Sequence, residues 1–189
     1  MSLSQLDERI ALIVIDLQKG TVASPASTHQ VAEVVERAAR LAVSFRERGL
    51  PVVLVNVTGG APGRTDAGPK KSLALPDEWA EFVPELMRQP DDHIVTKRRP
   101  GAFIGTDLHE YLQRQGGTQV VVAGVATSFG VESTARSAYD HGYNVTLVID
   151  AMADRDPDAH RHSAEKVFPR FGETTTTDEV LRLLHERPR

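Results

Sequence analysis

Runs of apolar, β-branched residues alternate with amphipathic stretches along nearly the whole chain. Continuous apolar runs such as IALIVID and PVVLVNV are typical of strands buried on both faces of a parallel sheet. Between these two runs, apolar residues recur at helical spacing until Gly49, where we expect the helix to end. The whole pattern predicts strands over 10–16, 51–57, 93–97, 118–124, 143–150 and 173–175, and helices over 31–49, 79–88, 106–117, 131–142, 158–168 and 177–187.

The alternation of strands and helices predicts an α/β fold with a doubly wound parallel sheet. Thr106 is the predicted N-cap of the helix over 106–117. Residues 58–78 are rich in Gly, Pro, Lys and Asp and are predicted to form a long loop. Its Gly/Pro part at 58–70 is too short to link two domains and is expected to overhang the site. No repeat or low-complexity segment divides the sequence, so we expect one domain over residues 1–189.

Composition narrows the class of protein. The 189 residues are 40% hydrophobic and 25% charged, as in a globular chain, and the formal net charge of −4 argues against a nucleic-acid or anionic-membrane partner. The absence of cysteine excludes disulfides, thiolate metal sites and a cysteine nucleophile. The polar N-terminus and the lack of an apolar run near the ~20 residues of a membrane-spanning helix predict a cytoplasmic protein.

Polar residues collect where the predicted strands end. In doubly wound sheets, ligands bind beyond the carboxyl ends of the strands. Asp16 follows the first strand, Lys97 ends the third, the turn 126–130 follows the fourth and Asp150 ends the fifth. Each also has an ordinary structural interpretation, because aspartates cap loops and a lysine in a basic run is commonly solvated.

Two nucleotide-binding motifs are absent. The first strand is followed by DLQKG where a dinucleotide fingerprint needs GxGxxG, and the two glycines at 124 and 130 lack the spacing and the lysine of a P-loop. No group of His, Asp or Glu has the spacing of metal ligands. We therefore expect no cofactor and no metal.

A serine-hydrolase interpretation stays open. The stretch ATSFG places Ser128 as in a GxSxG nucleophile elbow with alanine at its first position. Asp150 and then His160 or His162 follow in the order of a Ser-Asp-His triad. This interpretation leaves the aspartate and the lysine at the other strand ends without a role.

Three blocks resemble the isochorismatase-like hydrolases, a family that includes nicotinamidases, other cysteine amidohydrolases and isochorismatases. The blocks are LIVIDLQKG, VTKRRPGAFIGTDLHEYL and VVVAGVATSFGVESTARSAYDHGYNVTLVIDAMAD, and their order and spacing match over nearly the whole chain. The resemblance implies a Rossmann-like three-layer α/β/α sandwich with a six-stranded, mainly parallel sheet. It also implies a homodimer or homotetramer.

The resemblance further implies which residues form the site. Amidohydrolase members use an Asp-Lys-Cys triad, and Asp16 and Lys97 fall on its first two positions while Gly130 falls on the cysteine. A cis peptide bond is implied between Val125 and Ala126, and an oxyanion hole is implied at the backbone N–H groups of Ala126 and Gly130. Because glycine offers no thiolate, covalent amidase chemistry is not expected here.

Isochorismatases of this family also have glycine at that position, which implies acid catalysis: an aspartic acid protonates a vinyl ether and water completes the cleavage. Lys97 would then hold or orient the substrate, Gln18 would hold Asp16 or a water, Arg64 would bind an anionic group and Phe103 would line an apolar wall. The metal site of nicotinamidases is not implied, because the second strand ends in Asn-Val-Thr. The further candidates for substrate contact are Thr127 and Ser128.

The leading hypothesis is a hydrolase that acts on a small anionic molecule by Asp/Lys acid–base chemistry without a covalent cysteine intermediate. One alternative is a non-catalytic protein of the same fold that binds a small molecule or acts as a scaffold. The other is an esterase-like hydrolase that depends on Ser128.

Overall fold

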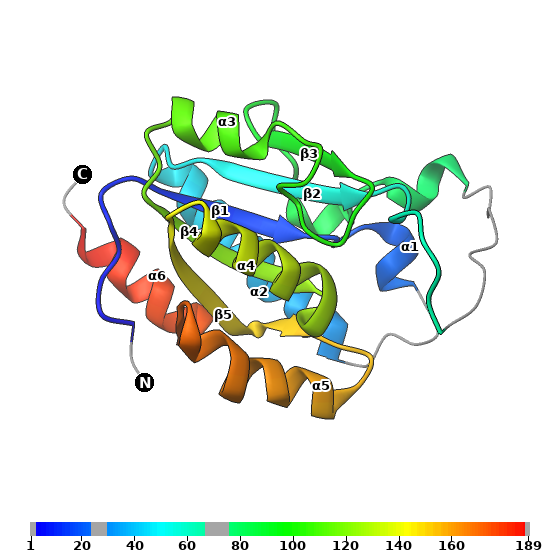
Figure 1. Cartoon of the computed structure of the whole chain (residues 1–189). Helices are drawn as coiled ribbons and strands as arrows, with labels where there is room; N and C mark the ends of the chain where they lie inside the picture. The colour runs from blue at the N-terminus through cyan, green and yellow to red at the C-terminus, as the bar shows by residue number, and fades with distance from the viewer. Residues whose placement is uncertain (1–2, 24–29, 67–75, 188–189) are drawn as a thin grey trace.

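The computed structural model describes residues 3–23, 30–66 and 76–187 of the chain. Within these residues, six parallel strands form one sheet in the order β3-β2-β1-β4-β5-β6. The strand order reverses between β1 and β4, and the carboxyl ends of the strands face α1 in Figure 1. The strands are β1 (Ile10–Ile15), β2 (Val52–Val57), β3 (His93–Lys97), β4 (Gln119–Val125), β5 (Asn144–Ala153) and β6 (Glu173–Thr175).

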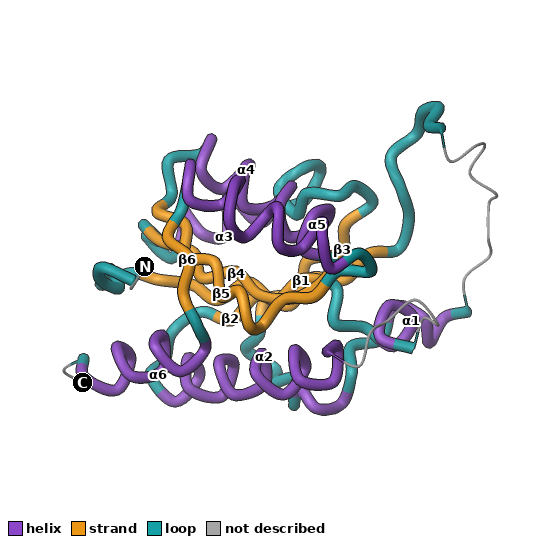
Figure 2. The backbone as a smooth tube through the Cα atoms, turned by 90° about the horizontal axis from the view of Figure 1, so that it is seen from below, coloured by secondary structure: helices purple, strands orange, loops and turns teal. Residues whose placement is uncertain are grey.

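Helices cover both faces of the sheet, which confirms the predicted three-layer α/β/α sandwich. Figure 2 shows α2 and α6 on one face and α3, α4 and α5 on the other. Among the described residues, no helix has both the length and the apolar content that crossing a membrane requires. The helices are α1 (Lys19–Val22), α2 (Gln30–Glu47), α3 (Leu108–Arg114), α4 (Glu132–Asp140), α5 (Pro157–His162) and α6 (Thr177–Glu186).

Two apolar layers hold the sandwich together. All six residues of β1 are buried, with alternate side chains packed into the layer on either face of the sheet. The apolar positions of α2 recur at i, i+3, i+4 and i+7, and this periodicity places them on the single stripe that packs against the sheet. The buried members of that stripe are Val31, Val34, Val35, Ala38, Leu41, Ala42 and Phe45.

Gly124 lets β1 and β4 approach closely at the switch in strand order. Its φ is +118°, and a Cβ built on it would lie 2.1 Å from the Ile15 carbonyl oxygen and 2.6 Å from the Ile15 nitrogen. Both neighbouring atoms belong to the backbone of the central strand, so they cannot move without disrupting the sheet. The position therefore requires glycine.

We expect Gly124→Ala to lower the free energy of unfolding by about 3 kcal/mol or more, because backbone overlap adds to the cost of the left-handed φ. Gly105→Ala is the matched control: its φ is +70°, but no atom lies within 4 Å of its added Cβ. The control should cost about 1 kcal/mol. Urea denaturation measures both, and equal losses would contradict the close-approach explanation.

The fifth strand is longer than predicted. β5 continues to Ala153, three residues beyond the expected end, and the register with β4 shifts between Val122 and Gly124. The shift carries Asp150 away from the predicted site, and its Oδ1 accepts hydrogen bonds from the backbone and hydroxyl of Thr177. Asp154 follows the strand instead, so the prediction that Asp150 ends it was wrong.

Other local predictions were wrong in smaller ways. The predicted helix over 79–88 consists of two 3₁₀ turns, η1 (Asp77–Ala80) and η2 (Pro84–Leu86), because Pro84 lacks the N–H that a continuous helix needs. α3 begins after Asp107 rather than after Thr106, whose hydroxyl donates to the Ala102 carbonyl and accepts from the Leu108 N–H at 3.4 Å. Part of the predicted loop over 58–78, residues 67–75, lies outside the described residues. The remaining turns are η3 (Thr127–Val131), η4 (Ser163–Val167) and η5 (Phe168–Arg170).

Candidate active site

A cavity of about 460 Å³ lies at the carboxyl ends of the strands, where the rule for doubly wound sheets places a ligand. Residues that follow β1, β3, β4 and β5 line it together. A larger and more open hollow of about 1020 Å³ runs along the outer face of α2 and contains none of the predicted site residues. The charged residues that line the smaller cavity are Asp16, Lys97, Arg99, Asp154 and Arg155, and its aromatic residues are Trp79 and Phe129.

Asp16 and Lys97 form a buried ion pair at the base of this cavity. The Lys97 Nζ lies 2.7 Å from Asp16 Oδ2 and also donates to the Pro100 carbonyl at 2.9 Å. Asp16 has a left-handed φ of 54°, a conformation that aspartate tolerates better than most residues. The pair joins two residues that are 81 positions apart in the sequence, at the ends of β1 and β3.

Burial raises the pKa of the Asp16 carboxyl from 3.8 to about 6. Loss of hydration is the largest cause, and the charge and hydrogen bond of Lys97 oppose it. Asp16 Oδ1 has no hydrogen-bond partner among the described residues, which further disfavours the ionised form. The carboxyl can therefore hold a proton much closer to neutral pH than an ordinary aspartate.

Gly130 packs directly against this carboxyl. A Cβ at this position would lie 3.2 Å from Asp16 Oδ2 and 3.3 Å from both the Ile15 Cγ2 and the Val125 carbonyl oxygen. Because those distances are short, there is no empty space at this position. The absence of a side chain lets the backbone of the turn pack directly against the aspartate. The peptide bond between Val125 and Ala126 is cis, and Ala126 lines the cavity.

The residues of the turn 126–131 bond to neighbouring elements rather than to one another's side chains. Thr127 is fully buried, and its hydroxyl lies 2.8 Å from His160 Nδ1. Ser128 donates to Asp154 Oδ2 from its backbone nitrogen at 2.7 Å and from its hydroxyl at 2.8 Å. Ser128 is thus paired with a carboxylate instead of a histidine, and the arrangement that a serine nucleophile needs is not formed.

Three predicted binding residues have other neighbours. The Gln18 amide is fully buried and bonds the backbone of Val57 and Trp79, so it ties the ends of β1 and β2 together instead of holding Asp16. Phe103 packs in the core, with its ring 5.2 Å from that of His141. Arg64 is exposed and is not among the residues that line the cavity.

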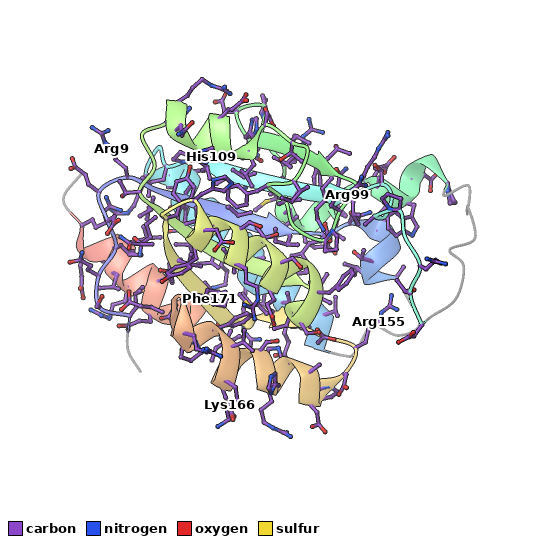
Figure 3. All side chains as sticks on the ribbon, in the orientation of Figure 1. Arg9, Arg99, His109, Arg155, Lys166 and Phe171 are labelled. Atoms are coloured by element: carbon purple, nitrogen blue, oxygen red, sulfur yellow. The ribbon has the colours of Figure 1, made fainter. Side chains whose placement is uncertain are left out.

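The mouth of the cavity contains two arginines and a tryptophan in addition to the residues assigned to the site from the sequence. Arg99 and Arg155 approach it from the segments after β3 and β5, and Figure 3 shows both near the carboxyl ends of the strands. Among the described residues, neither guanidinium has a carboxylate partner. Trp79 also lines the cavity and packs so closely on Gly20 that a Cβ there would lie 2.0 Å from the indole.

In the part of the chain that the structure describes, no group of three or more His, Asp or Glu side chains is arranged to hold a metal. The cavity presents one buried carboxyl with a raised pKa, one buried ammonium, two guanidinium groups and the Asp154 carboxylate, whose Oδ2 accepts from Ser128. Such a set can donate a proton and bind an anion.

Known proteins share both the sequence and the fold. Residues 10–179 match the isochorismatase domain. The chain is 41% identical to the isochorismatase family protein YwoC of Bacillus subtilis strain 168, across 92% of this chain and 93% of YwoC. It is 28% identical to the maleamate amidohydrolase of Pseudomonas putida KT2440, across 92% and 86%.

The structural comparison gives the same result. An isochorismatase family protein from Burkholderia thailandensis superimposes with a TM-score of 0.91 at 40% identity, covering 97% of this chain and 100% of that one. The match therefore extends over both the sequence blocks and the complete sheet. This chain belongs to the isochorismatase family.

Proposed function

We propose that this chain hydrolyses a small anionic vinyl ether of the isochorismate type, with Asp16 as general acid and without a covalent intermediate. One observation carries the proposal: a buried carboxyl with a pKa near 6 lines the cavity beside a residue that has no side chain to act as nucleophile. At pH 7 such a group is still protonated in about one molecule in ten. It can therefore donate a proton at physiological pH.

The reaction needs one acid and one water. Asp16 protonates the terminal vinyl carbon, which leaves an oxocarbenium ion, and water adds to the cationic carbon. The added water loses a proton to the Asp16 carboxylate, which leaves a hemiketal. Its ether C–O bond then breaks as the hemiketal hydroxyl proton passes to the departing oxygen, which gives a keto acid and an alcohol. General acid catalysis of this kind contributes about 10²- to 10⁴-fold to a rate.

Lys97 keeps the acid in place while it changes charge. Its ammonium donates to Asp16 Oδ2, so the carboxylate that forms after proton transfer already has a partner. The backbone of the turn lies on the other side of the carboxyl, where Gly130 packs against Asp16 and Ala126 lines the cavity. We assign the backbone N–H groups of Ala126 and Gly130 to oxygen atoms of the substrate.

Arg99 and Arg155 supply the preference for an anion. Both line the cavity, and neither has a carboxylate partner in the described parts of the chain. Guanidinium groups bind carboxylates with two parallel hydrogen bonds, which fixes the orientation of the ligand as well as its charge. They replace Arg64 in the role that the sequence had suggested for it.

We expect Arg99→Gln and Arg155→Gln each to raise KM by about tenfold or more, because each change removes a charge-assisted hydrogen bond to the substrate. The kcat should change less, since neither group touches the reacting atoms. Arg98→Gln and Arg64→Gln are matched controls, because both arginines are exposed and neither lines the cavity. Steady-state kinetics decides, and equal effects in all four variants would contradict the assignment.

The proposal is tested by assaying the unaltered protein with isochorismate and maleamate over pH 5–9. We expect turnover of isochorismate, with kcat/KM falling as pH rises above about 6, where Asp16 loses its proton. Hydrolysis of maleamate alone would overturn the vinyl ether chemistry. No turnover of either compound, together with saturable binding, would favour the non-catalytic binding protein.

A further inference from the structure

Three residues after β5 form hydrogen bonds with the turn 126–131 and with the first residue of α4. Asp154 accepts both hydrogen bonds of Ser128, at 2.7 and 2.8 Å. His160 on α5 meets the Thr127 hydroxyl at 2.8 Å. One helical turn further on, the hydroxyl of Ser163 donates to Glu132 at 2.7 Å. The contacts link residues that are 26 to 33 positions apart, and we call Asp154 and His160 the α5 clamp.

The bond between Thr127 and His160 is the costly one to lose, because Ser128 is exposed and its groups can bond to water. Thr127 is fully buried, so its hydroxyl depends on the protein for a partner. Burial also lowers the pKa of His160, against the opposing charge of Asp154, so the imidazole is neutral near pH 7. A neutral imidazole can accept a hydrogen bond from the Thr127 hydroxyl at Nδ1.

The same turn meets the catalytic groups on its other side. Ala126 lines the cavity, and Gly130 packs against Asp16. The carbonyl of Gly130 accepts a hydrogen bond from the buried Thr134 hydroxyl at 2.7 Å, and this hydroxyl accepts one from the Ala102 N–H at 3.1 Å. The turn is therefore held at its end by α4 and at its beginning by the α5 clamp.

We propose that Asp154 and His160 are positioning residues, which hold the start of the turn so that its backbone contacts the ligand in the cavity. Neither residue is assigned a chemical step. The inference rests on the proposed function only in taking this cavity as the ligand site, and it applies whichever bond is hydrolysed.

Amide hydrogen exchange of the full chain tests the clamp without any substrate. His160→Ala and Asp154→Ala should speed exchange of the amides at 127–131 by about two- to tenfold, the factor that one hydrogen bond contributes. The amides of β1 and β4 should exchange as in the unaltered protein, which separates local opening from general loss of stability. His162→Ala and Asp158→Ala are the matched controls, since both side chains are exposed on α5, the helix that carries His160. Unchanged exchange in the turn would overturn the clamp.

Kinetics with isochorismate tests the positioning role. His160→Ala should lower kcat by about tenfold or more with a smaller change in KM, as expected where transition-state contacts are lost. His160→Asn should restore most of kcat, because its amide can bond Thr127 from a position close to that of Nδ1. Equal changes in kcat and KM, or no rescue by asparagine, would contradict positioning. If the unaltered protein does not turn over isochorismate, the proposed function fails, and the exchange experiment still decides the clamp.

Discussion

Asp16→Asn is expected to lower turnover of isochorismate by about 10²- to 10⁴-fold, the usual contribution of a general acid. Asparagine has nearly the same shape, and its amide oxygen can still accept the hydrogen bond from Lys97. It cannot donate a proton to carbon, so the fold should survive while the chemistry is lost. Single-turnover kinetics measures the loss, and substrate affinity should change little.

Asp92→Asn is the matched control for this change. Asp92 is a second buried carboxylate in an ion pair, 2.8 Å from Arg46 and outside the cavity. Its replacement should lower the free energy of unfolding by about 2 kcal/mol and leave turnover unchanged. If Asp16→Asn retained more than a tenth of the activity, Asp16 would not be the acid.

Lys97→Met should move the pH dependence of the enzyme upward. Without the ammonium, only desolvation acts on Asp16, so its pKa rises above 6 and the acid limb of kcat/KM extends to higher pH. A raised carboxyl pKa favours the folded state at low pH, and this contribution is lost as pH rises through the folded pKa. The variant should therefore lose about 3 kcal/mol at pH 8 and less at pH 5.

Arg46→Met tests whether that pattern belongs to the site. This change breaks the ion pair between Arg46 and Asp92. The loss in free energy of unfolding should fall within the same range, without any shift in the pH–rate profile. Denaturation at the two pH values and a pH–rate profile separate the variants. A Lys97→Met profile that overlays the unaltered one would show that Lys97 does not act on Asp16.

The sequence predicted the sheet because its strands are apolar throughout. All six strands were found near their predicted positions, and the rule for strand ends brought Asp16 and Lys97 to one edge. The end of β5 was missed because the register shift beside β4 depends on pairing rather than on local pattern. Asp154 was not recognised for the same reason, and His160, a candidate partner of Ser128 in the sequence, meets Thr127 instead because only the folded chain places it beside the turn.

Side-chain direction was the other limit. Gln18 and Phe103 lie close to the site in sequence. In the folded chain the Gln18 amide bonds the backbone between β1 and β2, and the Phe103 side chain packs in the core. That Arg155 joins Arg99 at the mouth of the cavity could not be predicted either, because the two come from segments far apart in the chain. The homo-oligomer, the cytoplasmic location and the absence of metal, cofactor and nucleic-acid partner stay predictions.

The central place of β1 has a consequence for how the chain is made. Ile15 pairs with Gly124, so β1 gains its second neighbour only after about 109 further residues have been synthesised. At roughly 5–20 residues per second, this interval lasts about 5–20 s. During that time one edge of a wholly apolar strand has no native partner. We expect nascent chains to depend on chaperones that cover this edge.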